Sequence, residues 1–286
     1  MFPAHLRPAS IKVERGTGLP AVLREIGNAG LSFPLIVKPD IGFRGLLVGK
    51  VHTARELGDL LEAHAIDFIV QEFLDYPEEV GVFYIRVPGE EKGRIVSLTL
   101  KSFLGVTGDG RLTVRELAAQ DARALLQMAR LEEMYPGMMG DVPEKDAFVR
   151  LGVVGNHSKG TRFINGNSEA DERLARVFDE VTREMKGFFY GRFDIKCRSL
   201  DALKEGKDFK IIELNGIGAE PTHIYDQSRT TYPGALWTIM RHWTLVARIS
   251  AINHAKGAPY LPPGKMLRAL ADLRVYQRSL KKRLYR

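Results

Sequence analysis

Cysteine and tryptophan are scarce in this chain of 286 residues, which has one cysteine, Cys197, and two tryptophans. A lone cysteine excludes a disulfide framework and a zinc site made of cysteines, and it fits a reducing compartment. Long apolar runs are also missing. The most apolar helical stretch, residues 235–252, is interrupted by two arginines and a histidine, so it predicts no membrane span. The opening residues, Met1-Phe2-Pro3, have no signal-peptide pattern, and we expect a cytoplasmic globular protein.

The basic surplus is confined to the C-terminal end. The chain has 42 Lys and Arg against 35 Asp and Glu, a formal charge of +7. Residues 265–286 hold eight basic residues and one acid, so the rest of the chain is neutral. This distribution excludes a uniformly basic body, and we expect no nucleic-acid partner. Apolar residues recur in this segment at helical spacing, at Met266, Leu270 and Leu273. The helix either packs on the large lobe with its basic side chains extended into solvent, or docks on an anionic membrane surface.

The order of strands and helices predicts an α+β protein with two lobes. Strands are expected at 33–39, 46–51, 68–74, 80–87, 95–103, 188–196 and 209–214. Helices are expected after Thr53, over 113–130, and over 233–256. We expect three units: a small lobe (1–92), a large lobe (93–232), and C-terminal helices (233–286).

Lys38 ends the first of these strands and precedes a turn that contains Gly42 and Gly45. Glycines allow backbone N–H groups to close over a phosphate, and the lysine supplies a positive charge. The alternative is an ordinary lysine at the end of a strand.

Acidic and amide side chains lie on the two late strands. Asp194 shares a strand face with Arg192, and Glu213 shares one with Asn215. If the two strands pair, two carboxylates and an amide oxygen converge, which suits Mg²⁺. The alternative is a solvated strand face with unrelated acids.

A third feature is the strand that contains Gln71, Glu72 and Leu74, followed by an acidic turn with Glu79. Such a segment can offer backbone groups to a purine and a carboxylate to ribose hydroxyls. The alternative is a strand followed by a polar turn.

Taken in this order, these features resemble the ATP-grasp superfamily, specifically the ADP-forming carboxylate–amine ligases. The resemblance covers roughly residues 8–230. The segments 106–117 and 155–161 are similar to the Gly-Asp-Gly-x-x-Thr and Asn-x-Ser-x-Gly-Gly motifs of cyanophycin-synthetase-type ATP-grasp domains. The segment 213–226 resembles a group called D-alanine–D-alanine ligase-like. Members of the family carry an N-terminal lobe with a second ATP-contacting lysine, and this chain begins about where that lobe would end.

The resemblance implies a two-lobed ATP-grasp fold with ATP bound between two antiparallel sheets. It implies that Arg192, Lys38 and Arg44 act on the phosphoryl group. The residues implied for the nucleotide are Lys38, Asp40, Gly42, Arg44 and Gly45 on the phosphates, Gln71, Glu72 and Leu74 on adenine, and Glu79 on ribose. Those implied for Mg²⁺, or Mn²⁺, are Asp194, Glu213 and Asn215. Those implied for the substrate are Asn156, His157, Lys159, Arg162, Glu220 and His223.

The activity implied is the joining of a small-molecule or peptide carboxylate to an amine through an acylphosphate, with release of ADP and phosphate. Residues 219–223 replace the serine-containing segment that holds the D-alanine carboxylate in D-alanine–D-alanine ligases, so D-alanine is not the expected substrate. Two alternatives stay open: a phosphotransferase that stops after phosphorylation, and a nucleotide-binding module without turnover.

Overall fold

A four-stranded antiparallel sheet forms the smaller of the two sheets in the computed structural model, which describes residues 3–42, 45–64, 66–152, 155 and 159–284. Its order is β1 (Ser10–Val13), β4 (Phe68–Glu72), β2 (Leu35–Pro39) and β3 (Gly49–Val51). Helices α1 (Leu19–Asn28) and α2 (Ala54–Ala63) pack on one face, where Val22, Leu57 and Phe68 are buried in a common core. Thr53 caps α2 by accepting the N–H of Glu56, as expected from the sequence.

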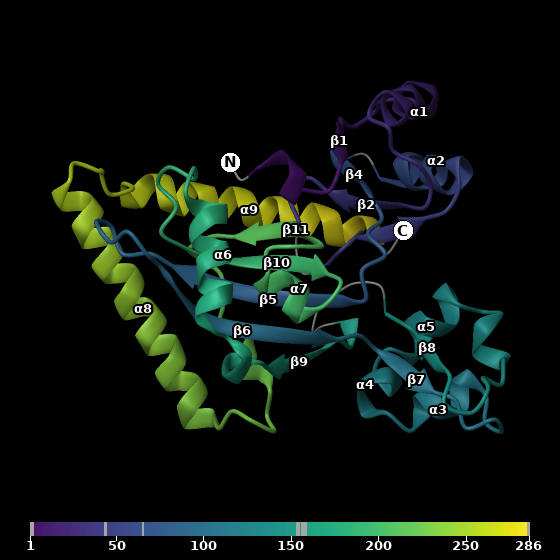
Figure 1. The fold of residues 1–286 in the computed structure, drawn as a ribbon. Helices are drawn as coiled ribbons and strands as arrows, with labels where there is room; N and C mark the ends of the chain where they lie inside the picture. The colour runs from purple at the N-terminus through teal and green to yellow at the C-terminus, as the bar shows by residue number, and fades with distance from the viewer. Residues whose placement is uncertain (1–2, 43–44, 65, 153–154, 156–158, 285–286) are drawn as a thin grey trace.

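The larger sheet has five antiparallel strands in the order β11 (Phe209–Asn215), β10 (Tyr190–Cys197), β5 (Glu78–Ile85), β6 (Arg94–Ser102) and β9 (Arg162–Asn165). Helix α6 (Glu172–Thr182) covers one face, where Tyr84, Phe178 and Phe193 form the centre of the largest core. Helix α7 (Leu200–Lys204) lies between β10 and β11 in the chain. Figure 1 shows this sheet at the centre, with α6 in front and the smaller sheet at the upper right. The prediction of an α+β fold with two antiparallel sheets is confirmed.

A third unit follows β6 and has a core of its own. Strands β7 (Gly105–Thr107) and β8 (Phe148–Arg150) form a two-stranded ribbon beside α3 (Val114–Ala119), α4 (Ala122–Leu125) and α5 (Met128–Met134). The single helix expected over 113–130 is wrong. Thr113 and Glu116 form a capping box at the start of α3, and the Asp121 carboxylate then accepts the N–H groups of Arg123 and Ala124. Asp121 thereby begins a new helix rather than continuing the first one.

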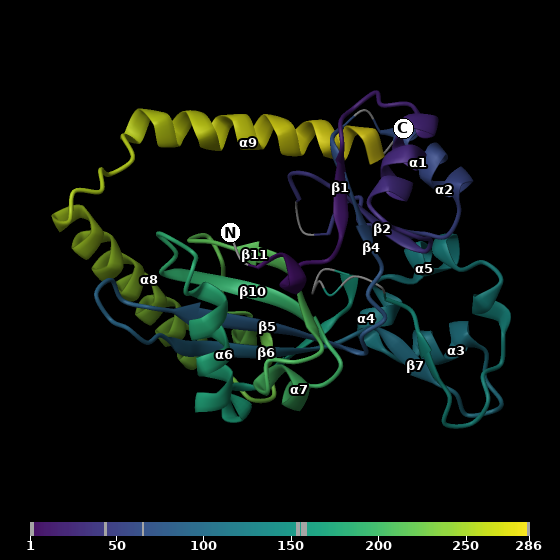
Figure 2. The ribbon, with the colours of Figure 1, turned by 45° about the horizontal axis from the view of Figure 1, so that its top comes forward.

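Two long helices complete the chain. Helix α8 (Tyr232–Ala255) packs Leu245 against Phe83 and Ile85, on the face of the larger sheet opposite α6. Helix α9 (Pro263–Leu284) then runs across to the smaller sheet, in both views (Figures 1 and 2). Tyr276 packs there against the core of the smaller sheet and donates to the carbonyl of Ile41. One alternative for the C-terminal helix was packing on the large lobe, but at Tyr276 the helix packs on the smaller sheet instead. In the described parts of the chain, every helix is too short or too polar to traverse a bilayer.

Short 3-10 turns are Ala4–Leu6, Met138–Gly140, Asn167–Glu169 and η5 (Thr222–Tyr225). The division expected after residue 92 falls inside the larger sheet, because β5 pairs with β6 and with β10. In the sheet topology, the change from the smaller to the larger sheet lies between β4 and β5. The division into three domains stays a prediction.

Candidate functional site

The candidate site lies on one face of the larger sheet, where strand register aligns polar residues in rows. One row runs from Glu213 through Asp194 and Gly81 to Thr99. A neighbouring row pairs Asn215 with Arg192. The strands therefore bring the predicted carboxylates, amide and arginine together on adjacent positions.

A β-bulge makes this alignment possible. The pairing of β10 with β11 changes register after Asp194: Asp194 faces Glu213, whereas Ile195 faces Ile211. Ile212 is therefore an extra residue in β11. In a regular strand, Ile211 and Glu213 would share a face. The extra residue lets Ile211 stay in the apolar core while Glu213 joins the polar face.

Asp194 is the centre of a buried network of charges. Its carboxylate accepts from Arg192 Nε at 2.8 Å and lies 3.4 Å from Lys101 Nζ. Lys101 in turn donates to Glu79 at 2.8 Å, and Lys196 lies 3.9 Å from the other oxygen of Glu79. The side chains of Lys101 and Glu79 are both 4% exposed. Three cations thus surround two buried carboxylates on one sheet face.

The pKa values of this network follow from the ion pairs. Burial opposes the charge of Lys101, but Asp194 and Glu79 together hold its pKa above the ordinary value. Burial likewise opposes the charge of Asp194, but Lys101 and Arg192 keep its pKa below the ordinary value. Both groups are therefore charged at neutral pH.

Glu213 differs from Asp194 because no salt bridge satisfies it within the described residues. Its side chain is exposed, and its pKa is raised by partial removal from water and by the nearby charge of Asp194. With its amide turned to suit its neighbours, Asn215 donates to Glu213 at 3.2 Å and accepts from Arg192 at 3.2 Å.

The oxygen donors of Asp194, Glu213 and Asn215, which we call the Glu213 corner, fit a hard divalent cation. Glu213 forms no salt bridge with a described residue, stands beside a second carboxylate, and has an amide next to it, which is the oxygen set that Mg²⁺ prefers. Among the described residues, no three His, Cys, Asp or Glu side chains are close enough to hold a metal. A cation at this corner would therefore be held by Glu213 and Asn215 with Asp194, completed by oxygens from outside the protein.

Lys38 connects the two sheets. Its ammonium group donates to the carbonyl of Ile212, the extra residue of the bulge, at 3.2 Å. Its pKa is lowered by burial, while Glu213 opposes that effect. Leu35 and Val37 point into the core of the smaller sheet, so Lys38 extends from the opposite face of β2. The lysine predicted to bind phosphate therefore ends beside the predicted metal ligands.

The strand expected to bind adenine is β4, and its polar residues are partly engaged. Gln71 is buried, and the carboxylate of Glu72 accepts the N–H of Ala9 at 2.9 Å. Leu74 is half-buried in the link to β5. Glu79, expected on ribose, is instead buried between Lys101 and Lys196, whereas Glu78 is exposed.

The turn after β2 is described only in part. The Asp40 carboxylate pairs with Lys12 at 2.7 Å, Gly42 is exposed, and Gly45 has a φ of 71°. Such a φ is readily adopted by glycine. Arg44, predicted to contact the γ-phosphate, lies outside the described residues.

The predicted substrate residues are dispersed. Arg162 pairs with Asp121 at 2.6 Å, and the pKa of Lys159 is lowered by burial and by Arg130. Asn156 and His157 lie outside the described residues. Between them and β8, Gly155 approaches the charge network so closely that a Cβ there would collide with the Glu79 carboxylate.

The segment after β11 reaches the site through its backbone. The carbonyl of Glu220 accepts from Arg192 at 3.0 Å, and its carboxylate accepts from Tyr225. His223 is buried and bonds to Ser97 of β6 at 2.7 Å, so it braces the segment against the sheet.

Lys101 and Lys196 belong to the site but were not among the predicted site residues. Lys196 shares a strand face with Arg192 and Asp194. Lys101 and Lys196 are the cross-strand neighbours of Glu79 on its two sides. The signal in the sequence is the alternation of Ser97, Thr99 and Lys101 with apolar neighbours, which indicates a polar face next to an apolar one.

Comparison with known proteins gives structural neighbours only. No protein-family model and no curated protein matches the chain. Among solved structures, a bifunctional glutathione synthetase from Pasteurella multocida has 20% identity and a TM-score of 0.39, covering 77% of this chain and 31% of that one. D-alanine–D-alanine ligase from Bacillus anthracis has 14% identity and a TM-score of 0.46, covering 88% and 64%. The ATP-grasp ligase PsnB, complexed with minimal precursor, has 16% identity and a TM-score of 0.42, covering 85% and 55%.

The chain thus spans between about a third and two thirds of the length of these neighbours. With TM-scores below 0.5, the similarity carries no argument about the site.

Proposed function

We propose that this chain carries the ATP site of an ATP-grasp ligase that activates a carboxylate and joins it to an amine. The observation that supports the proposal best is the meeting of Lys38, from the smaller sheet, with the Asp194–Glu213 pair of the larger sheet. A positive charge and paired carboxylates from separate sheets would hold the two ends of a metal-bound triphosphate.

Phosphoryl transfer needs positioning and neutralisation of charge rather than a protein nucleophile. In the proposed reaction, the substrate carboxylate attacks the γ-phosphorus, which gives an acylphosphate and ADP. An amine then attacks the acyl carbon, and inorganic phosphate leaves as the amide forms. Lys38 holds phosphate oxygens. The base is bound by backbone groups of the link after β4, which contains Leu74, because the backbone at Gln71 and Glu72 is paired with β1 and β2.

Arg192 is the group proposed to stabilise the transferred phosphoryl group and the tetrahedral intermediate. Its guanidinium is anchored by Asp194 and by the carbonyl of Glu220, so two fixed contacts define its direction. Mg²⁺ bound by Glu213 and Asn215 with Asp194 would neutralise phosphate charge. Lys101 is proposed to act indirectly: it compensates the negative charges of Asp194 and Glu79 and does not itself contact the substrate.

The test is ADP release in the presence of Mg²⁺ and mixtures of carboxylates and amines. We expect more than one ADP per protein only when both substrates are present, because the acylphosphate stays bound until an amine attacks it. Glu213→Gln should abolish ADP formation. Glu205→Gln is the matched control, because Glu205 is an exposed acid paired with Lys207 between the same two strands. Many ADP per protein formed from a carboxylate alone would favour a phosphotransferase, and nucleotide binding without ADP would contradict turnover.

We also propose that α9 contacts an anionic lipid surface. Met266, Leu270 and Leu273 are 41% to 46% exposed on this helix, with Lys265, Arg268 and Arg274 around them. A helix with basic residues beside an exposed apolar stripe suits the boundary between lipid headgroups and acyl chains.

Sedimentation with vesicles of phosphatidylcholine and phosphatidylglycerol tests this proposal. We expect binding that falls in Arg268→Gln/Arg274→Gln and on vesicles of phosphatidylcholine alone. Lys92→Gln/Lys186→Gln, which removes two exposed charges elsewhere, serves as the control. Equal sedimentation of both double variants would contradict the proposal.

A further inference from the structure

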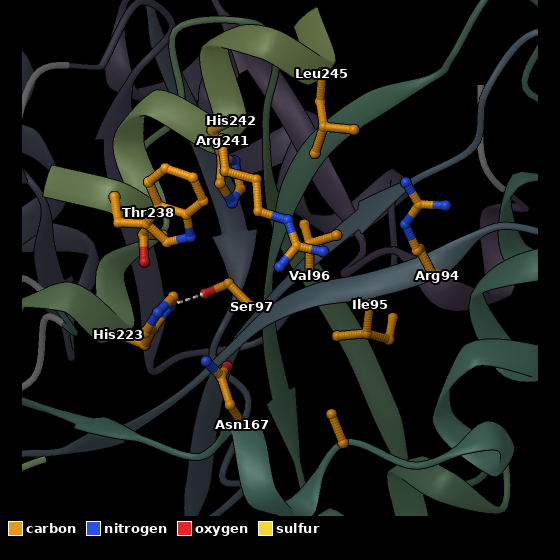
Figure 3. A pocket seen from close by; sticks show the side chains of 12 residues that line it. Arg94, Ile95, Val96, Ser97, Asn167, His223, Thr238, Arg241, His242 and Leu245 are labelled. Atoms are coloured by element: carbon orange, nitrogen blue, oxygen red, sulfur yellow. Dashed lines mark hydrogen bonds between the residues drawn. The ribbon is translucent and has the colours of Figure 1, made fainter. Parts of the chain in front are cut away.

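A separate cavity lies between β6, η5 and α8, beyond the charge network. Its volume is about 270 Å³. It is therefore large enough for a small organic molecule. Figure 3 shows Arg94 and Ser97 from β6, and Arg241 and His242 from α8, around this space.

The lining of the cavity is positively charged. Among the described residues that line it are Arg94 and Arg241, and none of these lining residues is an aspartate or glutamate. Neither arginine forms a salt bridge with another residue in the described ranges, although other surface arginines, such as Arg162 and Arg173, do. Two guanidinium groups at one cavity without an acid favour an anionic occupant.

Neutral polar groups also line the cavity. His223 uses Nδ1 for Ser97, and His242 uses Nδ1 for Tyr190 at 2.9 Å, which leaves one ring nitrogen of each histidine for another partner. Burial, His223 and Arg241 lower the pKa of His242 to about 4, so this ring is neutral at pH 7. Asn167 accepts the N–H of Leu98 with its side-chain oxygen, so its amino group is the donor that remains.

An apolar wall completes the cavity. Ile95 and Leu245 line it, and the indole of Trp237 lies at its rim, where the residue is 66% exposed. An oxyanion with a short apolar body therefore matches the space better than an inorganic ion or a neutral apolar molecule. Pockets that combine apolar walls with a few converging polar groups are typical ligand sites.

The cavity is distinct from the proposed ATP site. The cavity is lined by Ser97 and His223, whereas Thr99, two residues further along β6, belongs to the row that contains Asp194 and bonds to Thr222 at 3.0 Å. Lys38, Glu213 and Asn215 do not line it.

We propose that this cavity is a binding site for a small organic anion, with its carboxylate or phosphate group at Arg94 and Arg241 and its apolar part against Ile95 and Leu245. His223, which the family resemblance implies for the ligase substrate, also lines this cavity, but the assignment rests on the two arginines and does not depend on the proposed ligase activity.

Tryptophan fluorescence tests this site directly, because both tryptophans of the chain lie on α8 and only Trp237 lines the cavity. In Trp243→Phe, Trp237 is the sole indole. We expect isovalerate to change its fluorescence with saturation at constant ionic strength, isovaleramide to bind at least tenfold more weakly, and inorganic phosphate to compete with isovalerate.

Variants then identify the arginines as the binding groups. In the Trp243→Phe background, Arg94→Gln and Arg241→Gln should each weaken isovalerate binding at least tenfold. Arg248→Gln, an exposed arginine on the same helix outside the cavity, should leave it unchanged. Because all three arginines are exposed, we expect every variant to fold, which circular dichroism checks. Absence of saturation, equal binding of acid and amide, or equal effects of the three variants would overturn the proposal.

Discussion

Replacement of Lys101 by methionine tests how much the buried charge network contributes to the free energy of unfolding. The change keeps most of the unbranched apolar stem and removes the charge, which leaves Asp194 and Glu79 without the cation that lies 3.4 Å and 2.8 Å from them. Removing one partner of a buried ion pair costs about 3–5 kcal/mol. Arg192 and Lys196 stay beside the two carboxylates, so we expect the lower end, about 3 kcal/mol.

Urea unfolding measures this cost. For an m-value of about 1–3 kcal/mol per molar urea, a loss of about 3 kcal/mol lowers the midpoint by about 1 M or more. Lys207→Met is the control, because the Lys207–Glu205 pair is 71% and 55% exposed and such pairs contribute about 1 kcal/mol or less. Equal midpoints for the two variants would refute the view that Lys101 stabilises a buried pair of acids.

Two further perturbations follow from the structure. His242 has a pKa of about 4 in the folded protein against 6.5 ordinarily, so between these values the unfolded chain binds more protons and stability falls as the pH is lowered. This difference in pKa corresponds to about 3 kcal/mol of stability, at about 1.4 kcal/mol per pH unit. His242→Gln should remove that part of the pH dependence, measured by urea unfolding at pH 7 and pH 4. A pH dependence equal to that of the natural protein would contradict this. Gly155→Ala should destabilise by about 1–3 kcal/mol, because the added methyl group collides with Glu79. At Gly27 in α1 there is open space, so Gly27→Ala should stabilise by up to about 1 kcal/mol. Thermal unfolding measures both glycine variants, and effects of the same sign would contradict the packing.

The site residues could be predicted from the sequence where regular alternation defines a face. Arg192 and Asp194 share a face because β10 is regular at that point, and Lys38 points away from the core because Leu35 and Val37 point into it. The α+β class followed from the same periodicities.

The sequence could not predict the features that depend on contacts between distant segments. Nothing in Ile211-Ile212-Glu213 indicates a bulge, since the extra residue is defined only by the partner strand. Glu79 was expected to contact ribose, and its burial could not be foreseen. That burial depends on Lys101, Lys196 and Gly155, which come from three other segments. The break at Asp121 was missed because a capping aspartate also occurs within helical patterns.

The difference between Asp194 and Glu213 also changes how mutations are chosen. Asp194→Asn would leave Lys101 and Arg192 with less compensation in a buried site, so loss of activity there would be mixed with loss of stability. Glu213→Gln replaces an exposed side chain that forms no salt bridge within the described residues. It therefore tests chemistry with the smaller effect on folding.

The dissociation constant of Mg²⁺–ATP, measured by calorimetry for the natural chain and for Lys38→Met, tests the central claim most directly. If Lys38 and the Glu213 corner hold the triphosphate between the two sheets, the variant should bind at least tenfold more weakly, a loss of about 1.4 kcal/mol. Equal dissociation constants for the two proteins would contradict the proposed nucleotide site.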